Sequence, residues 1–336
     1  MRGVAAAERP FAVVDQHVDL VYRHLYKGKP FARGLGEFRA AALRDVGVVG
    51  VVLPLFVPEW ASPVGARRQD YEGAYAAAYG RLLETPPYAL PGCGVRQAGE
   101  ARSRPVQTWF AFEGAAHLEP RTDELASWML RGVRSFGLVH TAHNVLGSSS
   151  GRGEPPGGLT AKGRAVVEKI QELGGLMDVS HASDATTDEI LDMAAESRAI
   201  VIATHSNARA LAAHPRNLTD AQIRAIGRSG GVIGVNFHQP FLSGSGRASL
   251  KHVVEQVLYI RRVAGVEHVA IGSDFEGGIR PVPELGDASR YQVLAEALLE
   301  AGLTRREVSQ VMSENALRVL CRPFFSWRGD DRKAPP

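Results

Sequence analysis

Short runs of apolar residues alternate along nearly the whole chain with segments of helical spacing. The runs are rich in valine and isoleucine, which is typical of strands buried on both faces of a parallel sheet. This pattern predicts strands over residues 13–19, 48–56, 107–113, 135–139, 176–179, 199–203, 231–237 and 268–272. It predicts helices over residues 35–46, 71–83, 124–132, 161–173, 186–197, 222–229, 250–264 and 304–320. Alternation of this kind indicates an α/β fold, and eight strands in order predict a (β/α)₈ barrel of the TIM type.

Polar residues near the starts of three predicted helices support these boundaries. Thr160 is placed to accept a hydrogen bond from the first turn of the helix that follows it. Thr219 with Gln222, and Thr304 with Glu307, have the spacing of a capping box.

The barrel prediction treats residues 1–325 as a single domain, followed by a polar C-terminal tail over residues 326–336. Barrels of this type need about 250 residues and tolerate insertions, so one domain accommodates most of the 336 residues. Residues 147–158 are rich in glycine, serine and proline and follow the fourth predicted strand. We expect them to form a loop over the mouth of the barrel.

Residues of the types that bind metal ions follow or end five of the predicted strands. In a (β/α)₈ barrel the carboxyl ends of the strands meet at one face, and active sites are built there. The residues concerned are His17, Asp19, Glu113, His181, His205 and Asp274.

This set of side chains suits two divalent metal ions. His17 and Asp19 are two positions apart, so in an extended strand both point to the same side. The carboxylate of Glu113 can bridge two metals, or it can serve as an ordinary ion-pair partner. Neutral imidazoles such as those of His181 and His205 are good zinc ligands, although histidines at strand ends are also common as structural residues. Together they predict metal-assisted hydrolysis.

Other residues near the same strand ends are candidates for substrate binding and proton transfer. His140, with Asn144 just beyond it, could hydrogen-bond a substrate carbonyl and the oxyanion formed from it, or could ligate a metal. Arg216 has a planar guanidinium that suits a carboxylate, or lies on the surface. Asp274 could carry a proton from water to a leaving amine, or be a third metal ligand. His238 follows the seventh strand and could line the pocket.

Composition argues against several classes of partner. The net charge is only +3 and no block of Lys and Arg occurs, so nucleic acid is not an expected partner. No stretch approaches the roughly 18 apolar residues of a membrane span, and no apolar leader is found at the N-terminus. Cys93 and Cys321, far apart in sequence, predict neither a disulfide framework nor a metal site. We therefore expect a cytoplasmic protein without membrane contact.

At these residues the sequence resembles the membrane (renal) dipeptidase family, peptidase family M19 of the amidohydrolase superfamily. The resemblance covers nearly the whole chain and is strongest between Gly158 and Asn236. It rests on ordered motifs: Gly158-Leu159-Thr160, Asp178-Val179-Ser180-His181, His205-Ser206-Asn207-Ala208-Arg209, His214-Pro215-Arg216-Asn217-Leu218-Thr219, Gly272-Ser273-Asp274-Phe275 and Asn315-Ala316-Leu317-Arg318-Val319. The chain departs from the family at Glu276, where a second Asp is usual, and residues 57–104 match poorly.

The resemblance implies a role for each candidate residue. One metal would be held by His17 and Asp19 and the other by His181 and His205. It further implies that Glu113 bridges the metals, that His140 and Arg216 bind substrate, and that Asp274 is the acid/base.

We therefore expect a zinc-dependent dipeptidase that resembles the bacterial cytoplasmic members of the family. A hydroxide bridging the two metals would attack the peptide bond of a dipeptide, L,D-dipeptides included. A homodimer is possible. The alternatives are a related amidohydrolase acting on another amide or a specialised metabolite, and an inactive metal-binding homologue.

Overall fold

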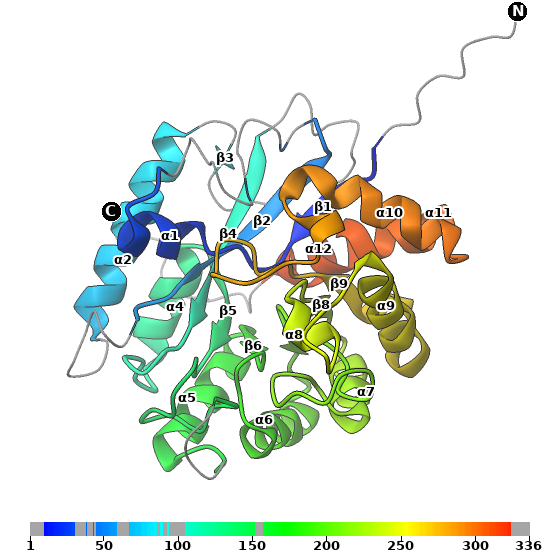
Figure 1. Cartoon of the computed structure of the whole chain (residues 1–336). Coiled ribbons are helices and arrows are strands. Elements are labelled where there is room, and N and C mark those ends of the chain that lie inside the picture. Colours follow the sequence, from blue (N-terminus) through cyan, green and yellow to red (C-terminus); the bar gives the residue numbers. More distant parts are fainter. Residues whose placement is uncertain are drawn as a thin grey trace, which may run out of the picture.

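The computed structural model describes residues 10–30, 38, 43, 45–58, 67–85, 88–89, 93, 105–151 and 157–323. In this part of the chain, parallel strands form a ring that helices surround (Figure 1). The α/β barrel predicted from the sequence is confirmed.

Eight parallel strands follow one another around the ring in the order β7-β6-β5-β4-β2-β1-β9-β8. Their bounds are β1 (Val13–Asp15), β2 (Val48–Leu55), β4 (Val106–Glu113), β5 (Val133–Gly137), β6 (Leu176–Asp178), β7 (Val201–Ile202), β8 (Ile233–Val235) and β9 (Val269–Ile271). A parallel bridge between Ala203 and Ile233 joins the two ends of this order, so the sheet closes on itself. These strands coincide with the eight predicted ones. A further short strand, β3 (Tyr88–Ala89), pairs with β4 outside the ring and was not predicted.

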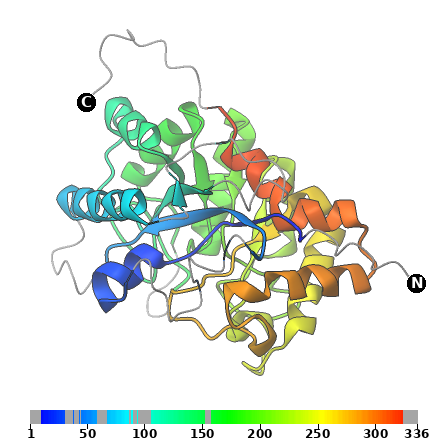
Figure 2. The same ribbon diagram turned by 90° about the horizontal axis from the view of Figure 1, so that it is seen from above.

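Helices cover the outside of the strands, as the view from above in Figure 2 also shows. Their bounds are α1 (Leu20–Lys27), α2 (Arg68–Glu84), α4 (Thr122–Leu130), α5 (Ala161–Glu172), α6 (Asp184–Ser197), α7 (Asp220–Arg228), α8 (Gln239–Leu242), α9 (Leu250–Ala264), α10 (Tyr291–Glu300), α11 (Arg305–Ser309) and α12 (Asn315–Leu320). One π-helical turn, Gln310–Glu314, joins α11 to α12. Three 3₁₀ turns span Val266–His268, Pro283–Leu285 and Ala288–Arg290.

The predicted caps are present. Thr160 accepts a hydrogen bond from the N–H of Gly163 at the start of α5. Complete capping boxes open α7, through Thr219 and Gln222, and α11, through Thr304 and Glu307. Helices α1, α8 and α10 were not predicted, and the helix expected over residues 35–46 lies largely outside the described residues.

Alternate residues of the strands contribute to two separate apolar clusters. The larger cluster packs the strands against the surrounding helices. The smaller one joins inward residues such as Val14, Trp109 and Ala270 to Val319 and Leu320 of α12. This alternation gives each strand an inner and an outer face, which is the arrangement of a filled barrel.

Cys93 and Cys321 form a disulfide, with their Cα atoms 5.5 Å apart. The expectation of no disulfide framework was therefore wrong. The bond joins residues separated by 228 positions, a separation across which sequence spacing carries no information on pairing.

The predicted tail and part of the predicted loop lie outside the described residues. The tail over residues 326–336 lies outside them, as does the middle of the loop over residues 147–158. The start of that loop lies against the barrel mouth, because the N–H of Ser150 donates to the carbonyl of His181 over 2.8 Å. Among the described helices, none combines the length and apolar character needed to cross a membrane.

Candidate metal centre

The five predicted metal ligands converge at the carboxyl ends of four strands. Glu113, the last residue of β4, lies at their centre. Its Oε1 lies 3.2 Å from Nε2 of His17, 2.9 Å from Nε2 of His181 and 3.5 Å from Nε2 of His205. Nε2 of His17 is 3.5 Å from Oδ2 of Asp19. Side chains that are up to 188 positions apart in the chain therefore point at one small volume.

The donor set fits divalent metal ions. Nε2 of His17 is buried and makes no hydrogen bond of acceptable geometry to any described residue, although the carboxylate of Glu113 is close by. Nε2 of His181 and Nε2 of His205 lie only 3.0 Å apart, so the two ring nitrogens face the same small volume. An ion accepted by these lone pairs would satisfy both features.

At His181, His205 and Glu113, electrostatics favour the protonation states that metal binding requires, whereas at His17 they favour the charged imidazolium, which must lose a proton before it can ligate a metal. Burial lowers the pKa of His181 and of His205 well below the ordinary histidine value, and nearby cationic groups act in the same direction. Burial alone would raise the pKa of Glu113, but the histidines around it hold that pKa well below its usual range. Burial also works against a charged His17, yet Glu113 and Asp19 raise its pKa well above the ordinary value. A carboxylate beside neutral imidazoles is the form in which these residues ligate metals.

Ligand atoms gather in three groups whose members lie within 4.8 Å of one another. The groups are His17, Glu113 and His205; Glu113, His140 and His181; and His17, Asp19 and Asp274. His140 and Asp274, expected to act on the substrate and the proton, thus stand within reach of a metal.

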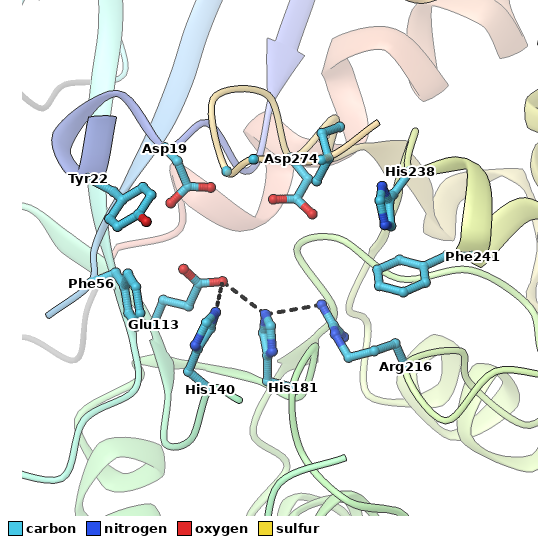
Figure 3. Close-up of a pocket in the computed structure, with 13 residues that line it drawn as sticks. Asp19, Tyr22, Phe56, Glu113, His140, His181, Arg216, His238, Phe241 and Asp274 are labelled. Atoms are coloured by element: carbon cyan, nitrogen blue, oxygen red, sulfur yellow. Dashed lines mark hydrogen bonds and ion pairs between the residues drawn. The ribbon is translucent and has the colours of Figure 1, made fainter. Parts of the chain in front are cut away.

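Asp274 follows β9 in a left-handed backbone conformation, with φ of 65°. Its Oδ2 accepts a hydrogen bond of 2.9 Å from the side-chain amide of Asn236, and its N–H donates to the carbonyl of His17 over 3.1 Å. Burial raises its pKa well above the ordinary value, and the carboxylates of Asp19 and Glu113 add to the effect. The structure therefore places a firmly held acid opposite Glu113 (Figure 3).

Arg216 stands at the other side of the cluster. Its Nη2 lies 3.1 Å from Nε2 of His181, and its guanidinium lies over the ring of Phe241 at 5.5 Å. The side chain is buried, and Nη1 has no hydrogen-bond partner among the described residues. An unpaired buried cation is costly, so this nitrogen is poised to receive an anion.

A cavity of about 250 Å³ joins these groups. His140 enters it beside Phe56, with ring centroids 4.2 Å apart, and Nδ1 of His140 lies 2.7 Å from the hydroxyl of Thr141. The complete lining is Asp19, Tyr22, Phe56, Glu113, His140, His181, Arg216, His238, Phe241, Asp274, Gly277, Gly278 and Ile279.

The two remaining candidates differ in their placement. His238 lines the cavity as expected; Nδ1 accepts the N–H of Arg280 over 2.8 Å, and burial lowers the pKa of His238 to about 4. Asn144 does not line the cavity. Its side chain donates to the carbonyl of Leu138 and accepts the N–H of Leu146, so it holds its own loop together.

Several wall residues escaped the sequence analysis. Tyr22 and Phe56 form one side of the cavity, with ring centroids 5.5 Å apart, and Phe241 forms part of the other. Tyr22 lies three residues after Asp19, a helical spacing that could have indicated it. Phe56 directly follows β2 and Phe241 lies in α8, and aromatic residues at such positions resemble ordinary core residues in the sequence.

A (β/α)₈ barrel with such a cluster at the carboxyl ends of its strands is the arrangement of a metal-dependent hydrolase. More particularly, this chain belongs to the membrane dipeptidase family, peptidase family M19, whose family model matches residues 1–322. The family predicted from the sequence motifs is confirmed.

The chain is also similar to curated proteins and to solved structures. A protein of Klebsiella pneumoniae, described as an uncharacterized protein in the pqqA 5′ region, is 37% identical over 219 residues, covering 62% of this chain and 79% of that protein. An uncharacterized dipeptidase of Schizosaccharomyces pombe is 35% identical over 213 residues, covering 62% of this chain. The matched region spans only 50% of that fungal protein. Among solved structures, a dipeptidase described as a metallopeptidase of family M19 is 26% identical, with a TM-score of 0.78 and coverage of 93% of this chain and 98% of that one.

Proposed function

We propose that this protein is a zinc-dependent dipeptidase that hydrolyses the single peptide bond of dipeptides, including those with a D-residue at the second position. The observation that carries the proposal is the buried guanidinium of Arg216, which contacts the metal-ligand candidate His181 and whose Nη1 has no partner in the part of the chain that the structure describes. A substrate carboxylate bound there would lie directly beside the ligand cluster.

Two zinc ions are the proposed cofactor, held by His17 and Asp19 on one side and His181 and His205 on the other, with Glu113 between them. When bound, such ions polarise a carbonyl and lower the pKa of a water shared between them, so that hydroxide is available at neutral pH.

The contact between Arg216 and His181 restricts which bond can be cut. Because a carboxylate on Arg216 lies next to the cluster, the bond that reaches the cluster is the one joining the last residue to the residue before it. The cavity of about 250 Å³ lies below the roughly 300–1,000 Å³ typical of ligand pockets. A dipeptide fits these two conditions, whereas a longer peptide would have to extend out of the cavity.

The remaining steps fall to His140 and Asp274. Nε2 of His140, 4.0 Å from Oε1 of Glu113, is placed to donate a hydrogen bond to the substrate carbonyl oxygen and to the oxyanion that develops from it. Asp274, oriented by Asn236, accepts the proton of the attacking water and returns it to the leaving nitrogen.

Tolerance of a D-residue follows from the number of points at which the substrate is fixed. Arg216 holds the carboxylate and the ligand cluster holds the carbonyl, so the side chain of the second residue is specified only by the wall. That wall includes Phe241 and Ile279, which are apolar and offer no hydrogen-bond donor or acceptor from their side chains.

The test compares free dipeptides with their C-terminal amides in wild-type protein and in Arg216→Met. The variant should lose turnover of the free acids by at least about tenfold more than turnover of the amides, since a charged pair in a closed site contributes a few kcal/mol. Arg224→Met is the matched control, because Arg224 lies on α7, pairs with Asp220 and does not line the cavity. Equal losses for acids and amides would reject the role of Arg216.

Metal content is measured on the same preparations. Wild-type protein loaded with zinc should contain two ions per chain, and His181→Ala should retain at most one. A wild-type protein with one ion or none would contradict the two-metal part of the proposal.

A further inference from the structure

The hydroxyl of Thr204 connects histidines assigned to different metals. Thr204 lies between β7 and His205 and is almost completely buried, with 1% of its surface exposed. Its Oγ1 lies 2.9 Å from Nδ1 of His205 and 3.4 Å from Nδ1 of His17. The same oxygen lies 2.5 Å from Oδ2 of Asp178, the last residue of β6.

The direction of these hydrogen bonds follows from counting donors. Asp178, when ionised, only accepts. Its Oδ1 is already used by the N–H and hydroxyl of Ser180, at 3.0 and 2.6 Å, and by the N–H of Thr204, at 3.1 Å. Oδ2 therefore receives the single hydroxyl proton of Thr204. The hydroxyl of Ser180, 3.2 Å from the same oxygen, does not compete because its own proton is donated to Oδ1 of Asp178. The lone pairs of Thr204 then remain for the two imidazoles, which must donate through Nδ1–H.

We propose that Thr204 is a positioning residue that fixes the Nδ1–H tautomer of both His17 and His205, with Asp178 fixing the direction of its hydroxyl. A neutral imidazole with its proton on Nδ1 has its lone pair on Nε2. Nε2 is the atom that each ring directs at Glu113. One hydroxyl thus prepares a ligand on each side of the proposed two-metal site, a second layer of contacts of the kind that orients metal-binding histidines.

This inference rests on the metal assignments of the proposed function, but its central claim concerns hydrogen positions in the protein alone. It differs from a packing role for Thr204, since valine has nearly the same shape and lacks only the hydroxyl. Thr204→Val removes the hydroxyl and with it the proposed contact. Thr204→Ser keeps the hydroxyl and lacks only the methyl group.

The first measurement is ¹⁵N NMR of histidine-labelled, metal-free protein, at a pH well above the ordinary histidine pKa of about 6.5. In wild-type protein and in Thr204→Ser, His205 should be in the Nδ1–H form. In Thr204→Val it should change to a mixture or to the Nε2–H form. Finding His205 as the Nε2–H tautomer in wild-type protein would overturn the inference without recourse to any variant.

The second measurement is zinc affinity by competition with a chelator. Thr204→Val should bind zinc about 10–100-fold more weakly, as is typical when a contact behind a metal ligand is lost, and Thr204→Ser should recover most of that loss. Wild-type affinity and wild-type tautomers in Thr204→Val would reduce Thr204 to a packing residue. If wild-type protein bound no zinc, the proposed function would fail, while the tautomer measurement would still decide the role of Thr204.

Discussion

Ser273 donates its backbone N–H to Oδ1 of Asp15 over 3.0 Å, although the two residues are 258 positions apart in the chain. The same oxygen accepts the N–H of His17 over 3.0 Å, and the hydroxyl of Tyr291 donates to Oδ2. Because Asp274 directly follows Ser273, this buried carboxylate joins the strand end that carries the metal-ligand candidates His17 and Asp19 to the strand end that carries the proposed acid/base.

Replacing Asp15 should therefore weaken both folding and the site. Asp15→Ala leaves two buried N–H groups without acceptors, at about 1–3 kcal/mol each in the free energy of unfolding. Asp15→Asn is the matched control, since its single carbonyl oxygen can keep both N–H contacts and should preserve most of the stability. Urea denaturation of the two variants checks this expectation. Equal stabilities would show that the carboxylate position does not join β1 to β9.

Gly277 passes very close to two acids of the site. A Cβ atom added there would lie 2.6 Å from Oδ1 of Asp274 and 2.7 Å from Oδ2 of Asp19. Gly277→Ala should push both carboxylates aside and reduce kcat by about 10²-fold, the usual effect of a misplacement near 1 Å. Unfolding should change little, because the strain falls on side chains at the cavity.

The control for this variant is Gly73→Ala, in the middle of α2. Among the described residues, no atom beyond the neighbouring residues and backbone of the helix itself lies within 4 Å of a Cβ added at Gly73, so the substitution should leave kcat unchanged and stabilise the helix by roughly 0.5–1 kcal/mol. Wild-type kcat in Gly277→Ala would mean that both acids relax freely around the methyl group.

His117, which lies outside the cavity lining, should make the free energy of unfolding depend on pH. Both ring nitrogens are buried without hydrogen-bond partners among the described residues, and the ring stacks on Tyr71 at 3.9 Å. Burial, with a smaller contribution from Arg68 and Lys162, lowers the pKa of His117 to about 3.

The sign of the effect follows from proton uptake. Below about pH 6.5 His117 is protonated in the unfolded chain but stays neutral in the folded protein. The free energy of unfolding therefore falls as the pH falls from about 6.5 towards 3. The contribution approaches 1.4 kcal/mol per pH unit in this window. His117→Phe keeps an aromatic ring and should reduce the slope of unfolding free energy against pH. The same slope in the variant and in wild-type protein would contradict the shift.

The elements that the sequence predicted well are those whose signals are local. Apolar, β-branched runs located all eight barrel strands, and Thr219 with Gln222 located the start of α7. Strand β3 was missed because two residues are too short to show any periodicity. Helix α1 was missed because it begins directly after the predicted strand that ends at the candidate ligand Asp19, and the sequence analysis assigned no element to its eight residues.

The convergence of the candidate ligands was predictable where such a residue directly follows a strand. The barrel topology brings candidates such as Glu113 and His205 together, whatever their separation in sequence. Asn144 shows where this reasoning fails, since its side chain is occupied by the backbone of its own loop. The pairing of Cys93 with Cys321 and the aromatic wall at Phe241 depend on how distant segments meet, which local patterns do not encode.

Glu276 illustrates a departure from the family that the structure explains. Its carboxylate pairs with Nη1 of Arg23 at 2.7 Å and accepts the N–H of Phe38 over 2.8 Å. It therefore ties α1 to the segment after β9 instead of facing the cavity, and it does not belong to the cavity lining.

Asp274 provides the sharpest test of the chemistry. Asp274→Asn keeps the shape of the side chain and its contact with Asn236, but it cannot accept and return a proton. If the acid/base assignment holds, the variant should keep two zinc ions, unfold like wild-type protein and lose about 10²–10⁴-fold in kcat. Its carboxylate also lies within 4.8 Å of ligand atoms of His17 and Asp19, so metal content must be measured beside the rate. If the variant loses one zinc ion, Asp274 is a metal ligand. If it keeps near-normal kcat, another group, such as His140, carries the proton.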